Sequence, residues 1–66
     1  MSKFSVRLKD LRIKKQVQQQ TLADLLGITT RALRFYEDGS REPNIERLIV
    51  LADFFDVTLD YLVGRK

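Results

Sequence analysis

The feature that most limits how this chain can fold is that none of its 66 residues is cysteine or histidine. Without them it has no disulfide scaffold, no thiol or imidazole catalyst and almost no route to a zinc or transition-metal site. A chain this short buries a modest share of its surface, so a compact helical bundle is the expected solution. We expect one domain over residues 1–66, with no room for a catalytic domain beside it.

Neither the start of the chain nor its hydropathy predicts export or membrane insertion. Residues 1–5 contain no apolar run of signal-peptide length. No stretch approaches the roughly 20 apolar residues that a membrane span requires. The expected location is the cytoplasm.

Charge is distributed unevenly along the chain. Residues 1–41 carry nine Lys or Arg and four Asp or Glu, a net charge of +5, whereas residues 42–66 carry three basic and five acidic residues, a net charge of −2. This asymmetry indicates one surface that faces a polyanion and another that faces away from it. Ordinary solvated helix faces would give the same counts, so charge alone leaves the two interpretations equal.

Glycines and capping residues divide the chain into five expected helices. Gly27, Gly39 and Gly64 each follow an apolar-periodic segment, where glycine commonly ends a helix. Polar caps flanked by a pair of apolar residues, or hydrophobic staples, mark helix starts at Gln18, Thr29 and Thr58, and Asn44 is a further cap. Gln18 is the weakest of these caps. The expected helices cover residues 3–16, 18–26, 29–38, 44–55 and 58–63.

Apolar residues at helical spacing predict the core of the bundle. They lie on one face of each expected helix, and we interpret them as packing residues. The predicted core residues are Phe4, Leu8, Leu11, Leu22, Ala23, Leu26, Leu33, Tyr36, Ile45, Leu48, Ala52, Phe55, Leu59 and Leu62.

Residues 19–38 have the pattern of a helix-turn-helix. Ala23 is small where the two helices cross closely, and Gly27 permits the sharp turn between them. The apolar residues that seal the pair together are Leu22, Leu26, Ile28, Leu33 and Tyr36.

The whole chain resembles the XRE family of phage-repressor-like helix-turn-helix proteins. The resemblance is carried by residues 8–12, 22–29, 36–39 and 57–62. It implies an all-α, five-helix bundle of the phage-repressor DNA-binding domain type, whose third helix enters the major groove of double-stranded DNA. It also implies a bacterial or phage-encoded transcriptional repressor or similar regulator, usually a dimer on a palindromic operator, with no enzymatic activity and no cofactor.

Projection of residues 29–38 as a helix separates a packing side from a reading side. Leu33, Tyr36 and Glu37 point inward. The outward residues are Thr30, Arg31, Arg34, Phe35 and Asp38. Of these, Thr30, Arg31, Arg34 and Phe35 are the candidate base-contacting residues.

The outward side chains suit different contacts. Arg31 can donate two hydrogen bonds to guanine O6 and N7, and Thr30 can bond a base edge or a phosphate. For Arg34 a phosphate contact is favoured over a base contact, with an idle charge as the alternative. Phe35 would be exposed unless another group covers its ring. Contact with a thymine methyl is one way to cover it, and coverage by the domain itself or by a partner protein is an equal alternative.

Three further polar residues are candidate phosphate contacts. Gln19, in the first turn of the second helix, matches a position where family members place a glutamine against the DNA backbone, and the helix N-terminus adds to that site. Arg41 follows the third helix. Asn44 caps the fourth, and capping alone would explain it.

Arg12 and Glu37 correspond to an arginine of the first helix and an acid of the third that form a buried or half-buried ion pair in the family. The resemblance therefore predicts this pair here. Its role would be structural, since it would hold the third helix at its docking angle.

A small apolar patch is the candidate dimer interface, because a monomer contacts only half of a palindromic site. Its residues are Val50, Phe54, Leu59, Tyr61 and Val63. Completion of the monomer's own core is the slightly favoured alternative. Any homodimer is expected to be weak or to form on DNA.

Two other classes of function are alternatives to DNA binding. A protein-interaction module, such as an antitoxin or antirepressor component, would use exposed Phe35 and Phe54. An enzyme would need acid-base chemistry from carboxylates alone, and no suitable pair of acids is evident in the sequence. No pocket for a small-molecule ligand is expected in so small a core.

Overall fold

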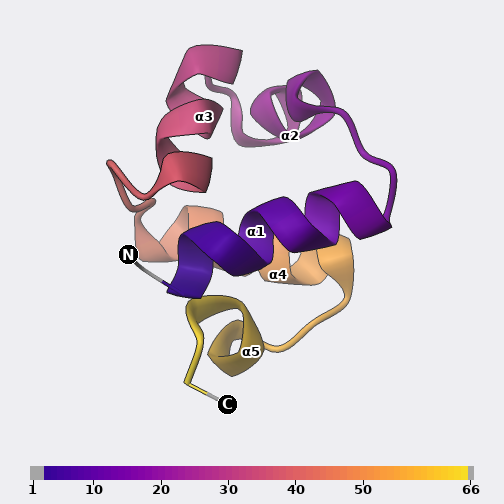
Figure 1. Cartoon of the computed structure of the whole chain (residues 1–66), viewed down its shortest axis with the longest axis vertical. Helices are drawn as coiled ribbons and strands as arrows, with labels where there is room; N and C mark the ends of the chain where they lie inside the picture. Colours follow the sequence, from indigo (N-terminus) through magenta and orange to yellow (C-terminus); the bar gives the residue numbers. More distant parts are fainter. Residues whose placement is uncertain (1–2, 66) are drawn as a thin grey trace.

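The computed structural model describes residues 3–65 and shows five helices there, with no strand in that range (Figure 1). The helices are α1 (Lys3–Lys14), α2 (Gln19–Leu26), α3 (Thr30–Asp38), α4 (Ile45–Phe55) and α5 (Leu59–Val63). The predicted all-α, five-helix bundle is confirmed. Residues 1, 2 and 66 of the expected domain lie outside the described residues. Within 3–65, no helix has the length and apolar character needed to cross a membrane.

Helix α1 is the central element. It packs against both α3 and α5, while α2 packs on α3 and α4 packs on α5. In Figure 1, α1 crosses the middle of the molecule, α2 and α3 lie together at one end, and α5 lies at the other. The helix-turn-helix formed by α2 and α3 therefore packs on the rest of the bundle chiefly through the contact of α3 with α1.

Three helices begin as their capping residues predict. The side chains of Thr29, Asn44 and Thr58 each accept a hydrogen bond from the backbone N–H three residues later, at 3.1, 2.9 and 3.0 Å. Gln18, the weakest predicted cap, has an extended backbone but makes no side-chain capping bond. Helix α2 therefore begins with uncapped N–H groups, unlike α3, α4 and α5.

The predicted glycines follow α2, α3 and α5, each with a left-handed φ between 69° and 85°. Helix α1 instead ends at Lys14, two residues earlier than expected. Gln16 adopts the left-handed conformation with a φ of 56°, and the Val17 N–H bonds back to the Arg12 carbonyl at 2.9 Å. No glycine marks this end, so the helix predicted from the sequence was too long.

The core contains most of the predicted residues, but the packing face of α4 differs from the prediction. Ile45 is 57% exposed, whereas Leu51, which was not predicted, is fully buried. Leu48, Leu51, Ala52 and Phe55 follow the spacing i, i+3, i+4, i+7. Ile45 lies one turn before the start of this stripe, so the prediction that it belongs to the core was wrong.

Candidate nucleic-acid interface

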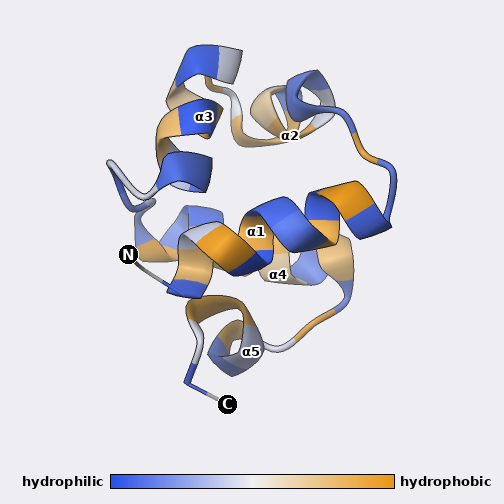
Figure 2. Ribbon diagram, in the orientation of Figure 1, coloured by the Kyte–Doolittle hydropathy of each residue, from blue (hydrophilic) through white to orange (hydrophobic). Residues whose placement is uncertain are grey.

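The outward side of α3 is the candidate interface. Its side chains are exposed or half-buried: Thr30, Arg31, Arg34, Phe35 and Asp38. Leu33 and Tyr36 are buried on the opposite side. Helix α3 is mostly hydrophilic in Figure 2. The structure therefore orients α3 as the helical projection predicted.

Arg12 and Glu37 form an ion pair that joins α1 to α3. Arg12 Nε lies 2.6 Å from Glu37 Oε2, and Arg12 Nη2 donates to Glu37 Oε1 at 3.2 Å. The side chains are 16% and 6% exposed, respectively. Arg12 Nη1 also donates to the Val17 carbonyl at 3.3 Å. The predicted contact is present, and it connects the end of α3 to α1 and to the segment that precedes α2.

Gln19, the first residue of α2, extends this pair into a chain of hydrogen bonds. Its Nε2 donates to Glu37 Oε1 at 3.2 Å, and its Oε1 accepts from Arg34 Nε at 3.3 Å. These two bonds orient the Gln19 amide, and one of its N–H groups is left over. The sequence placed Gln19 and Arg34 separately, whereas the structure brings them together beside Glu37.

The ring of Phe35 is half-buried beside two arginines. The Arg31 guanidinium carbon lies 5.8 Å from the ring centroid, and that of Arg41 lies 5.0 Å from it. Both distances are within the range of a cation–π contact. The ring is therefore covered in part by arginines of the domain itself, which was one of the alternatives to a thymine methyl.

The loop after α3 places Arg41 next to that ring. The Arg41 N–H donates to the Phe35 carbonyl at 3.2 Å. Just before it, the Ser40 N–H donates to Asp38 Oδ1 at 2.7 Å. Hydrogen bonding from the Ser40 side chain, and then from its backbone, lowers the pKa of the Asp38 carboxyl below its ordinary value. The hydrogen bond from Ser40 to Asp38 supports the turn that carries Arg41.

The arginines of the interface divide into two kinds. Arg12 and Arg34 donate to other side chains of the bundle. Arg31 and Arg41 are exposed, and neither guanidinium forms a hydrogen bond or an ion pair with any residue in the described range. Their N–H donors are available for phosphate or guanine, both of which suit the planar fork of a guanidinium.

Asn44, the third predicted phosphate contact, is exposed at the start of α4. Its Oδ1 accepts the capping bond from the Arg47 N–H. Capping alone was the alternative explanation for this residue, and the bond that it requires is present.

The predicted apolar patch on α4 and α5 forms only in part. Val50, Phe54 and Tyr61 are exposed, whereas Leu59 and Val63 are half-buried. Phe54 meets the buried Phe55 edge-on, with ring centroids 5.1 Å apart. The structure thus leaves one side of α4 with exposed apolar surface, while part of the patch turns toward the core.

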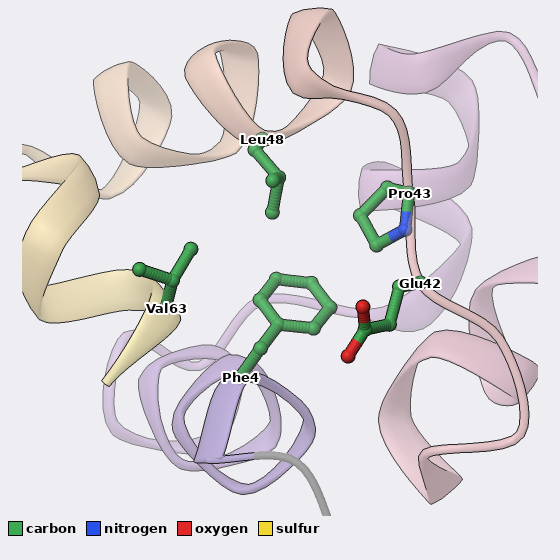
Figure 3. A pocket seen from close by; sticks show the side chains of 5 residues that line it. All are labelled: Phe4, Glu42, Pro43, Leu48 and Val63. Carbon is green, nitrogen blue, oxygen red and sulfur yellow. The ribbon is translucent and has the colours of Figure 1, made fainter. Parts of the chain in front are cut away.

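Figure 3 shows where Val63 turns. It lines a hollow with Phe4 and Leu48, and Pro43 and Glu42 complete the lining. The hollow measures about 240 Å³, below the roughly 300–1,000 Å³ of typical small-molecule pockets. We assign no ligand to it.

Two positioning contacts were not predicted from the sequence. Arg47 Nη1 donates to the Tyr36 hydroxyl at 3.1 Å, which joins α4 to α3. Arg7 Nη1 donates to the Tyr61 carbonyl at 2.6 Å, and its guanidinium carbon lies 4.2 Å from the centre of the Tyr61 ring. Both pairs join residues far apart in sequence, and no local pattern marks them.

The known proteins that this chain resembles include helix-turn-helix transcriptional regulators. The family model described as helix-turn-helix matches residues 8–62. The HTH-type transcriptional regulator AnsR of Bacillus subtilis is 50% identical over 60 residues, which are 91% of this chain and 52% of AnsR. The chain spans about half the length of the curated relatives that it matches.

Two solved structures share this fold. A transcriptional regulator from Listeria innocua superposes with a TM-score of 0.92 at 34% identity, over 97% of this chain and 60% of that one. The P22 c2 repressor, solved in complex with a synthetic operator, superposes with a TM-score of 0.85 at 27% identity, over 96% of both chains.

Proposed function

Because the chain belongs to the helix-turn-helix family of phage-repressor-like (XRE) transcriptional regulators, we propose that it binds double-stranded DNA sequence-specifically, with α3 in the major groove. The observation that carries this proposal is the outward side of α3, where Arg31 and the neighbouring Arg41 keep their donors free. A regulator of this kind acts on DNA without catalysis, in the cytoplasm of a bacterial host.

Base recognition is assigned to the first turns of α3. Arg31 is the proposed guanine reader, because its guanidinium is exposed near the N-terminal end of the helix. Thr30, the first residue of α3, would bond a base edge or a phosphate. Arg34 is proposed as a phosphate contact, since its bond to Gln19 draws it toward α2.

Phosphate contacts are assigned to the residues that flank α3. Gln19 lies at the uncapped start of α2 and has one amide N–H left over. Arg41 follows α3, and Asn44 begins α4. These contacts would fix the orientation of the domain on the duplex without reading sequence.

A homodimer on a palindromic operator follows from the same proposal, and it would act as a transcriptional repressor or similar regulator. Val50 and Phe54 are its proposed centre, joined by Tyr61. Leu59 and Val63 are half-buried and would add little contact area.

The alternative of a protein-interaction module, such as an antitoxin or antirepressor component, has less support. It relied on exposure of both Phe35 and Phe54, and Phe35 is half-buried beside its own arginines. We therefore retain DNA binding as the proposed function.

The experiment that tests this function is selection from random and genomic DNA fragments, followed by titration at two salt concentrations. Arg31→Ala is compared with the parent protein, and Lys14→Ala, an exposed cation at the end of α1, is the matched charge control. We expect steep salt dependence, and a loss of discrimination for Arg31→Ala of about 1–3 kcal/mol. Absence of any selected fragment would turn attention to a partner protein.

A further inference from the structure

The ring of Phe35 contacts two arginines that belong to different elements of the candidate interface. Phe35 belongs to α3, Arg31 lies one turn before it, and Arg41 belongs to the following loop. The guanidinium carbons of both arginines lie within 6 Å of the ring centroid, at 5.8 and 5.0 Å. The Arg41 N–H also bonds the Phe35 carbonyl at 3.2 Å, which fixes the loop backbone next to the ring.

We propose that Phe35 is a positioning residue whose ring holds the guanidinium groups of Arg31 and Arg41, so that the two arginines bind DNA as one unit. This inference rests on the proposed function and deepens it, because it couples a base reader on α3 to a phosphate contact in the next loop. It also replaces the idea that Phe35 itself reads a thymine methyl.

The chemistry of the contact suits this role. A cation–π contact restrains a guanidinium without using its N–H donors in hydrogen bonds, so the donors stay free for DNA. Long arginine side chains otherwise lose conformational freedom when they bind, and that loss weakens affinity. Phe35 is anchored in α3 and half-buried, so it restrains both arginines before DNA arrives.

The contrast with Arg34 supports the assignment. Arg34 also points outward from α3, but its Nε donates to Gln19 Oε1 at 3.3 Å. That bond restrains the Arg34 side chain through α2 and uses one of its donors. Arg31 and Arg41 have no such partner among residues 3–65, and the Phe35 ring is their shared contact there.

The test compares Phe35→Leu, which keeps apolar bulk but loses the aromatic face, with Phe35→Tyr, which keeps the face. Affinity for the fragment selected by the parent is measured for each, alone and combined with Arg31→Ala, Arg41→Ala or both. Two arginine side chains that must then be ordered on binding correspond to about a 5- to 150-fold loss of affinity for Phe35→Leu, whereas Phe35→Tyr is expected to stay within about twofold of the parent. In the parent, the two arginine substitutions should be non-additive, and in the Phe35→Leu background they should become independent.

A DNA-free readout accompanies the titrations. The Cδ protons of Arg31 and Arg41 should show upfield ring-current shifts by NMR in the parent and in Phe35→Tyr, but not in Phe35→Leu. If the parent selects no DNA, the proposed function fails and this inference falls with it. If the parent selects DNA but the two arginines contribute independently in it, or Phe35→Leu binds as tightly, this inference alone is overturned. Should Phe35→Leu not fold, arginine additivity in the parent decides.

Discussion

At the scale of single residues, Glu37 shows how one carboxylate joins α3, the proposed DNA-facing helix, to the bundle. It is 6% exposed and accepts hydrogen bonds from Arg12 of α1 and Gln19 of α2. A charge so poorly solvated is tolerated only when its partners satisfy it. Removing either member leaves the other with a hydrogen bond from Gln19 or to Val17 but without an opposite charge, which makes the pair a sensitive point for stability.

We expect Glu37→Gln to lower the free energy of unfolding by about 2–4 kcal/mol, measured by urea denaturation. A double-mutant cycle with Arg12→Met should give a coupling energy of about 1–3 kcal/mol. Glu46→Gln is the control, because Glu46 is exposed in the first turn of α4 and should change stability by less than about 0.5 kcal/mol. A coupling energy of zero would remove the structural role of the pair.

At the scale of elements, the helix starts differ in one respect that matters for both stability and function. Helices α3, α4 and α5 have side-chain caps, whereas the Gln18 side chain makes no capping bond to α2, and the Thr21 N–H donates to the Gln18 carbonyl instead at 3.1 Å. A cap stabilises a helix by satisfying N–H groups that have no partner within it. Helix α2 lacks that stabilisation at its N-terminus, which we propose faces a DNA phosphate.

The caps predict a simple difference in stability. Thr29→Ala should lower the free energy of unfolding by about 1 kcal/mol, because it removes the bond from the Ala32 N–H. Gln18→Ala, at the equivalent position of α2, should leave it unchanged within about 0.3 kcal/mol, since no capping bond is lost. Thermal or urea unfolding of both variants measures this, and equal losses would contradict it.

At the scale of the whole molecule, the proposed DNA-facing side and the exposed apolar side belong to different helices. The free arginines lie on α3 and the loop after it, whereas Val50 and Phe54 lie on α4. Phe54 is 42% exposed, and its ring is already held edge-on by Phe55. A preordered exposed aromatic of this kind suits the centre of an interface.

We expect Phe54→Glu to abolish cooperative binding to DNA with two half-sites, with a loss of about 10-fold or more, because it places a charge in the proposed interface. Binding to a single half-site should not change. Ile13→Glu is the matched control, since Ile13 is an exposed aliphatic residue on α1. Sedimentation of the protein with each DNA measures the assembly, and equal effects of the two substitutions would exclude this surface.

Local patterns in the sequence determined the helices, their caps and most of the core. Helical periodicity and capping residues act within a few positions of one another, so the starts at Thr29, Asn44 and Thr58 could be read directly. The contact between Arg12 and Glu37 was predicted through the family resemblance rather than from any local pattern, because 25 positions separate the two residues.

Only the tertiary structure decided which residues meet across the bundle. The exposure of Ile45 and the burial of Leu51 depend on which face of α4 the other helices cover. The end of α1 depends on a left-handed conformation at Gln16, where the sequence has no glycine. The arginines beside Phe35 and the bonds of Gln19 likewise join separate elements. Periodicity specifies the apolar side of a helix, whereas its partners follow from the packing of the whole chain.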